Sequence, residues 1–167
     1  PILWFDHCTN PVTVNGNGST LKIADGLKFG SFDSSGNPTA GINTNTANIA
    51  AIGDVISFYY CGTVSVNNLE IDGNMANADL GGFWGDTGRQ CRATAVYCFQ
   101  NKRSFISNVY AHHNCLDGFI IQDLTPNTED TQAYMEHCLS EYNARQGFSL
   151  LDTRQFTAVN CQFNFSG

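Results

Sequence analysis

A chain of 167 residues with 42% hydrophobic content is the length of one domain, and it can bury a sizeable core. Its formal net charge of −7 argues against a nucleic-acid backbone or an anionic membrane as partner, because both are negatively charged. No apolar run approaches the length of a transmembrane helix.

The composition also argues against a helical protein. Sixteen glycines, together with many Asn, Thr and Ser residues, separate short runs of β-branched and aromatic residues. No window keeps the 3.6-residue period of an amphipathic helix. We therefore expect an all-β chain built from short strands.

In chain order, the pattern predicts repeats of three short strands each. First strands are expected at 3–7, 56–60, 94–98, 119–122 and 148–151. Second strands are expected at 12–14, 64–66, 104–106, 133–135 and 156–158, and third strands at 69–72, 109–113, 138–142 and 161–165. Two long insertions, about 31–54 and 74–92, and a smaller one at 124–132 interrupt the repeats.

Segments 104–123 and 133–152 match at a spacing of 29 residues. The matching pairs are Asn114 with Asn143, Gly118 with Gly147, Phe119 with Phe148, and Asp123 with Asp152. Such a period of short strands with insertions is typical of a solenoid. We expect one domain over 1–167 with about five coils, forming part of a longer chain because both ends look cut.

A residue that marks a sharp bend recurs between the second and third strands. The marks are Asn68, Asn108, His137 and Asn160. Asn tolerates the left-handed backbone that a sharp bend needs, and its amide can bond to the Asn about 4.8 Å away on a stacked parallel strand. The marks therefore predict a partial asparagine ladder.

Seven cysteines make an odd count and include no CxxC or other metal-binding spacing. Most of them fit the apolar positions of the repeat. They are interpreted as buried thiols that act as small hydrophobes, and disulfides or a metal site remain the alternatives.

The repeat resembles the right-handed parallel β-helix of the pectin-lyase-like superfamily. The likeness lies in the order V-x-V/I-x-N, an alternating strand, a D-G or Q-G turn and an apolar strand, and in the segments IDGN, HHNCLDGF and NARQGFSL. This superfamily includes pectate lyases, polygalacturonases, alginate epimerases and lyases, and bacteriophage tailspikes. The resemblance implies a polysaccharide partner bound in a groove over the first-strand sheet.

Period-2 alternation places a column of polar residues on the outer face of the third strands: Asp72, His112, Glu141 and Asn164. A stack of acid, imidazole and acid can hold a proton near neutral pH, so His112 and Glu141 are candidate catalytic residues and Asp72 a candidate substrate ligand. The alternative is a solvated polar ladder. His113 is expected in the interior or at the turn edge, as a core histidine.

The turn into a first strand offers a second candidate. Asp117 with Gly118 resembles the Asp-Gly of polygalacturonases, where the Asp belongs to the catalytic acids. Arg145 and Gln146 stand at the matching place one coil later, so Arg145 can hold or deprotonate a uronate that Asp117 orients and Gln146 contacts. No paired Asp-Asp or Gly-His-Gly follows, which departs from the polygalacturonase pattern. A structural Asp-Gly turn paired to Arg is the alternative.

The second insertion is expected to overhang the same groove. Phe83 and Trp84, flanked by glycines, are a candidate sugar-stacking platform, and Arg89 on the same loop is a further candidate substrate ligand. The alternative is that Trp84 only anchors the loop.

Three functions follow as expectations. The first is a polysaccharide lyase, epimerase or hydrolase, with calcium as a possible cofactor. The second is a carbohydrate-binding, adhesin or tailspike domain, trimeric in the tailspike case. The third is a structural spacer. The resemblance implies an extracellular, cell-surface or virion location.

Overall fold

The computed structural model describes residues 3–37, 49–50, 54–80, 93–124 and 131–167. The described chain is all-β, as expected, and almost all of its strand pairs are parallel. Its short 3-10 turn, η2 (Met75–Asn77), follows a strand. Among the described residues, no helix has the length and apolar character needed to cross a bilayer.

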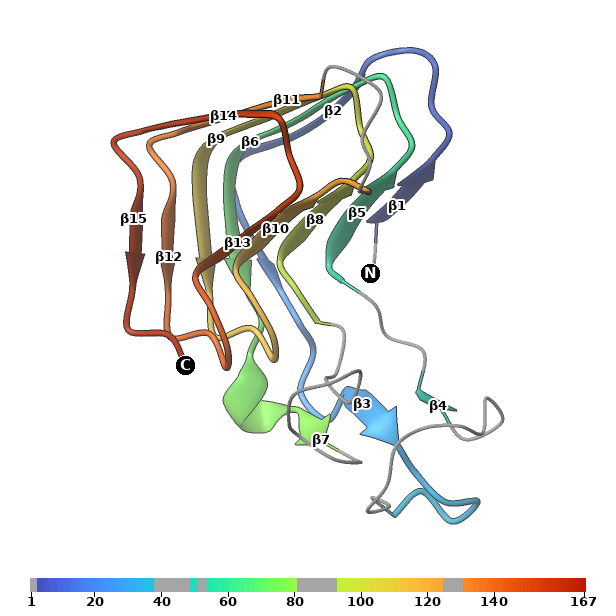
Figure 1. The fold of residues 1–167 in the computed structure, drawn as a ribbon. Coiled ribbons are helices and arrows are strands. Elements are labelled where there is room, and N and C mark those ends of the chain that lie inside the picture. The colour runs from blue at the N-terminus through green and yellow to red at the C-terminus, as the bar shows by residue number, and fades with distance from the viewer. Residues whose placement is uncertain (1–2, 38–48, 51–53, 81–92, 125–130) are drawn as a thin grey trace.

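Five short strands form one parallel sheet in the order β1-β5-β8-β10-β13 (Figure 1). Their bounds are β1 (Leu3–Asp6), β5 (Ile56–Tyr59), β8 (Val96–Phe99), β10 (Phe119–Gln122) and β13 (Phe148–Leu151). The expected first strands are therefore confirmed, except that the third begins at Val96, two residues later than expected. The register pairs Cys98 with Phe58, and the strand ends at Phe99, one residue after the expected end at Cys98.

Between successive strands of this sheet, the chain contributes to a seven-stranded parallel sheet. Its strands are β2 (Val12–Lys22), β6 (Thr63–Asp72), β9 (Arg103–His112), β11 (Gln132–Glu136), β12 (Leu139–Glu141), β14 (Gln155–Val159) and β15 (Gln162–Asn164). The expected second strands pair in the expected register, for example Val64 with Ser104 and Ser104 with Ala133. In β6 and β9 the expected second and third strands are continuous, and β2 runs on to Lys22, beyond its expected second strand at 12–14.

The bend marks adopt the expected left-handed backbone. Asn68, Asn108, His137 and Asn160 have φ of 54°, 51°, 51° and 52°, and all four are exposed. A side-chain contact joins His137 Nε2 to Asn160 Nδ2 at 3.2 Å, and Asn68 Nδ2 reaches Asn15 at 3.4 Å. The marks thus set the bend more than they form a continuous ladder.

A second asparagine ladder is buried at the opposite end of the third strands. Asn114 and Asn143 are 0% and 3% exposed, and Asn143 Oδ1 accepts from the side chain and the backbone N–H of Asn114 at 2.8 and 3.1 Å. Asn74, 6% exposed, donates to the Ile23 carbonyl at 2.8 Å. These amides satisfy backbone groups that the turn would otherwise leave buried and unpaired.

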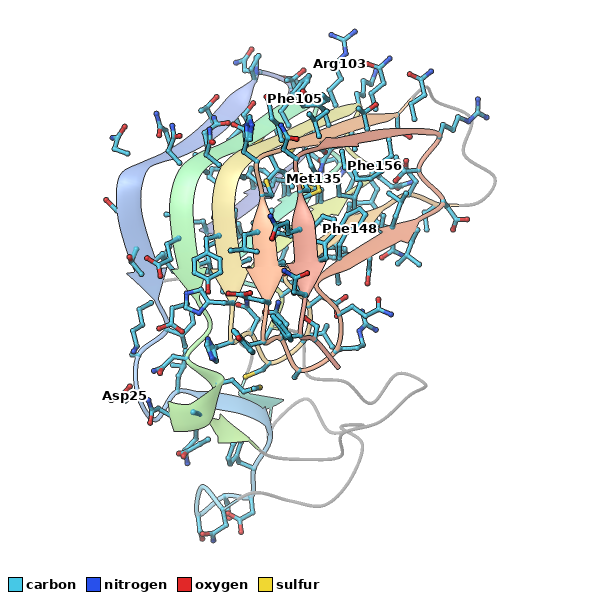
Figure 2. The ribbon with its side chains drawn as sticks, turned by 90° about the vertical axis from the view of Figure 1, so that its left-hand side faces the viewer. Asp25, Arg103, Phe105, Met135, Phe148 and Phe156 are labelled. Atoms are coloured by element: carbon cyan, nitrogen blue, oxygen red, sulfur yellow. The ribbon has the colours of Figure 1, made fainter. Side chains whose placement is uncertain are left out.

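The core lies between the two large sheets. Strand β6 shows the alternation expected of a half-buried strand, with Val64, Val66, Leu69 and Ile71 all at most 6% exposed. Aromatic rings stack between repeats, as in the pair Phe148 and Phe156 at 4.9 Å. Figure 2 shows Met135, Phe148 and Phe156 between the sheets and Phe105 directed away from them.

A small third sheet, not predicted from the sequence, is built from β3 (Lys28–Ser31), which ends where the first insertion begins, and from two strands within the insertions, β4 (Ile49–Ala50) and β7 (Asp79–Leu80). It has the order β4-β3-β7. As expected, these segments follow third strands and precede first strands. Figure 1 shows this small sheet beyond the ends of the main strands.

The cysteines of the repeat are thiols, as expected. Cys8, Cys61, Cys98, Cys138 and Cys161 are free, and the middle three are at most 2% exposed. Burial raises the pKa of Cys98 and of Cys138 to about 12. These thiols therefore act as core hydrophobes at neutral pH. Cys91 lies outside the described residues.

The bend at Asn108 gives a first prediction. Asn108→Ile should destabilise the protein by about 1–2 kcal/mol, because a β-branched side chain resists the left-handed backbone while the exposed amide gives up little packing. Asn108→Gly should stay within about 1 kcal/mol of the parent, since glycine adopts this backbone freely. Urea unfolding measures both, and equal losses in the two variants would show that the amide, not the backbone, sets the bend.

Candidate functional site

Asp117 and Arg145 form an ion pair between adjacent repeats, just before β10 and β13. The Asp117 side chain is 0% exposed, whereas that of Arg145 is 35% exposed. Arg145 Nε donates to Oδ1 at 2.7 Å and Nη2 to Oδ2 at 2.5 Å. This two-point geometry is the strongest form of an arginine–carboxylate pair.

Two more donors occupy the remaining acceptor positions of Asp117. The backbone N–H of Gln146 donates to Oδ1 at 3.2 Å, and Ser149 Oγ to Oδ2 at 2.7 Å. A carboxylate accepts about four hydrogen bonds, so these donors saturate it. Of the two interpretations that the sequence leaves open, the geometry favours the structural turn over proton abstraction.

The turn is also closely packed. A Cβ on Gly118 would lie 1.8 Å from Ser140 Oγ and 2.7 Å from the Gly147 carbonyl oxygen. Glycine is therefore required at this position, because any side chain would push the adjacent repeats apart. The ion pair and the glycine together hold β10 against β13.

The outer face of the five-stranded sheet carries a cluster of aromatic side chains, here called the outer aromatic face. It consists of Trp4, Tyr59, Tyr60, Tyr97 and Phe99, from or directly beside β1, β5 and β8. Ring centroids are 5.9 Å apart for Trp4 and Tyr59, and 5.5 Å for Tyr59 and Tyr97. Trp4 is 70% and Tyr60 44% exposed, so their rings are open to a ligand.

Polar groups border the outer aromatic face. The Tyr97 hydroxyl donates to Gln122 Oε1 at 2.6 Å, and Asp6 lies 2.6 Å from the ring of His7, which stacks on Tyr60. On the same sheet, Gln146 Oε1 lies 2.5 Å from Ser149 Oγ. Flat apolar rings beside amides and hydroxyls are the side chains that bind sugar rings.

An acid–imidazole cluster lies on the seven-stranded sheet, as expected. The register pairs Asp72 with His112 and His112 with Glu141. His112 is 8% exposed; its Nε2 lies 3.1 Å from Glu70 Oε1, and its Nδ1 lies 3.9 Å from Asp72 Oδ1. Glu141 instead accepts from the Tyr110 hydroxyl at 2.8 Å. The imidazole thus faces the carboxylates of the preceding repeat.

His113 lies at the turn edge, one of its two expected places, and the expectation that it is a core histidine is wrong. It has a left-handed backbone with φ of 53°, it is not buried, and its ring stacks on Tyr142 at 5.4 Å. The bend after β9 turns this side chain out of the strand alternation. Its Nδ1 lies 2.7 Å from Nδ1 of His112.

Two groups beside His112 have shifted pKa values. Hydrogen bonds from Thr20 and then His112 lower the pKa of Glu70. Burial, followed by the hydrogen bond to Glu141, raises the pKa of Tyr110 to about 12. At neutral pH the cluster therefore combines ionised Glu70 with a neutral phenol.

The remaining predicted site residues divide in two groups. Asp72 is engaged by Lys22 Nζ at 3.3 Å and by the Asn74 N–H at 2.8 Å, and Gln146 is exposed beside Arg145. Phe83, Trp84 and Arg89 lie outside the described residues. The outer aromatic face was not predicted as a site, although alternate positions of the first strands, such as Trp4 and Asp6, indicate which side chains point outward.

No protein-family model, curated protein or solved structure matches this chain. Function is therefore inferred from the geometry of the sites and from the sequence resemblance.

The ion pair gives a second prediction. Arg145→Gln should destabilise the protein by about 3 kcal/mol, because it leaves the Asp117 charge buried without its partner. Asp117→Asn should cost less, since the arginine left behind reaches water. Urea unfolding of both variants measures the difference, and the opposite order would mean that Arg145 does not neutralise Asp117.

Tyr110 gives a third prediction. In an alkaline titration followed by tyrosinate absorbance, Tyr110→Phe should remove a component that ionises near pH 12. Because this pKa is raised on folding, the stability it contributes is complete below about pH 10 and is lost as the pH rises toward 12. Tyr134→Phe is the control: it removes another tyrosine whose pKa is raised, and it should leave the component near pH 12 in place. A Tyr110→Phe curve identical to that of the parent would contradict the assignment.

Proposed function

We propose that this chain is a right-handed parallel β-helix similar to the pectin-lyase-like superfamily, and that it binds a polysaccharide across the outer aromatic face. Two observations support the β-helix. Equivalent strands of successive repeats pair in parallel, and the chain alternates between the two large sheets along its length. About five turns of such a helix account for the described repeats.

The outer aromatic face carries the functional part of the proposal. Trp4, Tyr59 and Tyr60 present ring surface on the five-stranded sheet, the sheet over which the superfamily resemblance implies a sugar groove. The C–H face of a pyranose packs on such rings, and neighbouring amides and hydroxyls bond its hydroxyl groups. The rings are distributed over three neighbouring strands, β1, β5 and β8, which lie about 4.8 Å apart, and such a row suits an extended polymer.

The geometry favours a protein that binds the polysaccharide and does not use Asp117 as a catalytic residue. Its carboxylate is buried and saturated by Arg145, Gln146 and Ser149, so it has no lone pair for a substrate proton. Arg145 and Gln146 remain accessible at the edge of the sheet. They are proposed as contacts for a uronate carboxylate or a hydroxyl, which a guanidinium and an amide both recognise.

Catalysis is the second candidate function, and one observation favours it. His112 is buried against Glu70, an arrangement that orients an imidazole for proton transfer. Lyase, epimerase or hydrolase activity on the same class of polymer would then depend on His112. An extracellular, cell-surface or virion location is proposed with either function, because such polymers occur there.

The fourth prediction tests binding. The purified chain, with and without calcium, is titrated with uronate and neutral polysaccharides in affinity electrophoresis. Trp4→Ala should weaken binding of the recognised polymer about tenfold, which corresponds to about 1.4 kcal/mol. Phe105→Ala is the matched control, since Phe105 is 39% exposed but lies on the other large sheet.

Turnover is followed in the same samples, by absorbance of unsaturated ends for a lyase and by reducing ends for a hydrolase. Turnover that disappears in His112→Gln would establish the second candidate. Equal loss of binding in the Trp4 and Phe105 variants would contradict the proposal that the polysaccharide binds on the outer aromatic face. If the chain binds no polysaccharide, the result would favour the third expected function, a structural spacer.

A further inference from the structure

We propose that Asp72, His112 and His113 form a binding site for a divalent transition-metal ion, with Glu70 as the outer carboxylate that orients His112. The three residues offer ligand atoms that all lie within 4.8 Å of one another. The site lies where β6 and β9 end, on a different sheet from the outer aromatic face. It is therefore independent of polysaccharide binding at the outer aromatic face, although it shares His112 with the second candidate function.

Glu70 orients His112 and fixes its tautomer for metal binding. Its Oε1 lies 3.1 Å from His112 Nε2, and a carboxylate can only accept a hydrogen bond, so Nε2 carries the proton. In the neutral ring this leaves the lone pair on Nδ1, which faces Asp72 and His113. Metal-ligating histidines almost always have such a carboxylate or carbonyl behind them.

Neighbouring side chains hold this arrangement in place. Thr20 Oγ1 donates to Glu70 Oε2 at 2.5 Å, and the Tyr110 ring stacks on His112 with centroids 4.3 Å apart. The imidazole plane and the carboxylate behind it are thus fixed before any ion binds. A ligand set that is already ordered loses less conformational entropy on binding.

The two imidazoles approach each other through their Nδ1 atoms, which are 2.7 Å apart. A zinc ion about 2.0–2.1 Å from each nitrogen, at a tetrahedral angle, needs them about 3.3 Å apart. The rings must therefore separate by roughly half an ångström, and His113 can make this shift because it is not buried. Without the ion, a single N–H···N hydrogen bond accounts for the same contact.

Asp72 completes the site with its carboxylate. Its Oδ1 lies 3.9 Å from His112 Nδ1, and its Oδ2 lies 3.3 Å from Lys22 Nζ. The ammonium group of Lys22 competes with a metal cation for this carboxylate, and its positive charge also repels the cation. Removing the charge of Lys22 should therefore tighten metal binding, a result that a purely structural role of the cluster does not produce.

The ligand types select the metal. Two imidazoles and one carboxylate suit Zn²⁺, Co²⁺, Ni²⁺ or Cu²⁺, whereas Ca²⁺ and Mg²⁺ take oxygen ligands. Three protein ligands also leave a coordination position for water or another small ligand. The site therefore does not suit calcium, the cofactor expected with the enzyme function.

The fifth prediction tests this site on the whole chain by calorimetric titration with Zn²⁺ and by the visible spectrum with Co²⁺. We expect one ion per chain and the absorption of cobalt bound to nitrogen and oxygen. His113→Ala and Glu70→Gln should each weaken Zn²⁺ binding at least tenfold, while Lys22→Gln should strengthen it. His137→Ala is the matched control, because His137 is an exposed histidine with a left-handed backbone elsewhere.

Circular dichroism and urea unfolding show whether each variant keeps the fold, and His113→Ala is chosen because its side chain is not buried. Three outcomes would overturn the proposal. They are no binding of Zn²⁺ or Co²⁺, unchanged binding in folded His113→Ala, and strong near-ultraviolet charge-transfer bands with Co²⁺, which would assign the ion to cysteine thiolates.

Discussion

The structure depends on parallel, in-register backbone pairing between equivalent strands of successive repeats. Each strand of the five-stranded sheet pairs residue by residue with the next, as Phe119 does with Val96 on one side and Phe148 on the other. Such pairing stacks like positions about 4.8 Å apart. Side chains at equivalent positions of successive repeats therefore lie side by side on one face of a sheet. The outer aromatic face and the cluster of Asp72, His112 and His113 both arise in this way.

The left-handed bends make this pairing possible. They let β6 and β9 turn between their two halves without losing register, and they release His113 from the strand alternation. The first repeat also bends at a left-handed residue, Asn17 with φ of 50°, which lies in a bulge between Asn15 and Ser19 opposite Asn68. Buried amides such as Asn143 then satisfy the turn at the other end of the third strands.

The strands and their register could be predicted from the sequence, because β-branched runs such as 64–66 alternate clearly and recur with the bend marks. The expected start of strand β8 is two residues too early, because the buried Thr94 and Ala95 fit a strand pattern although strand pairing starts only at Val96.

The spacing of the repeats predicts that Asp117 and Arg145 lie on adjacent repeats. It does not predict that the Asp117 carboxylate is saturated, because the hydrogen bond from Ser149 depends on how the two side chains are oriented. Alternation along the first strands places Trp4 and Asp6 on the same face, but the outer aromatic face could be predicted only by also knowing that this face of the sheet stays uncovered, which depends on how the sheets pack. The contact between His112 and Glu70 is diagonal across strands, so the straight columns expected from alternation missed it.

Hydroxyl-radical footprinting read by mass spectrometry tests the central claim, a polysaccharide on the outer aromatic face, without changing a residue. Exposed aromatic rings are oxidised unless a ligand covers them. A bound polysaccharide should protect Trp4 and Tyr60, which are 70% and 44% exposed, and leave Phe105 and Phe165 as reactive as before. Undiminished oxidation of Trp4 and Tyr60 in the presence of a bound polymer would contradict the account.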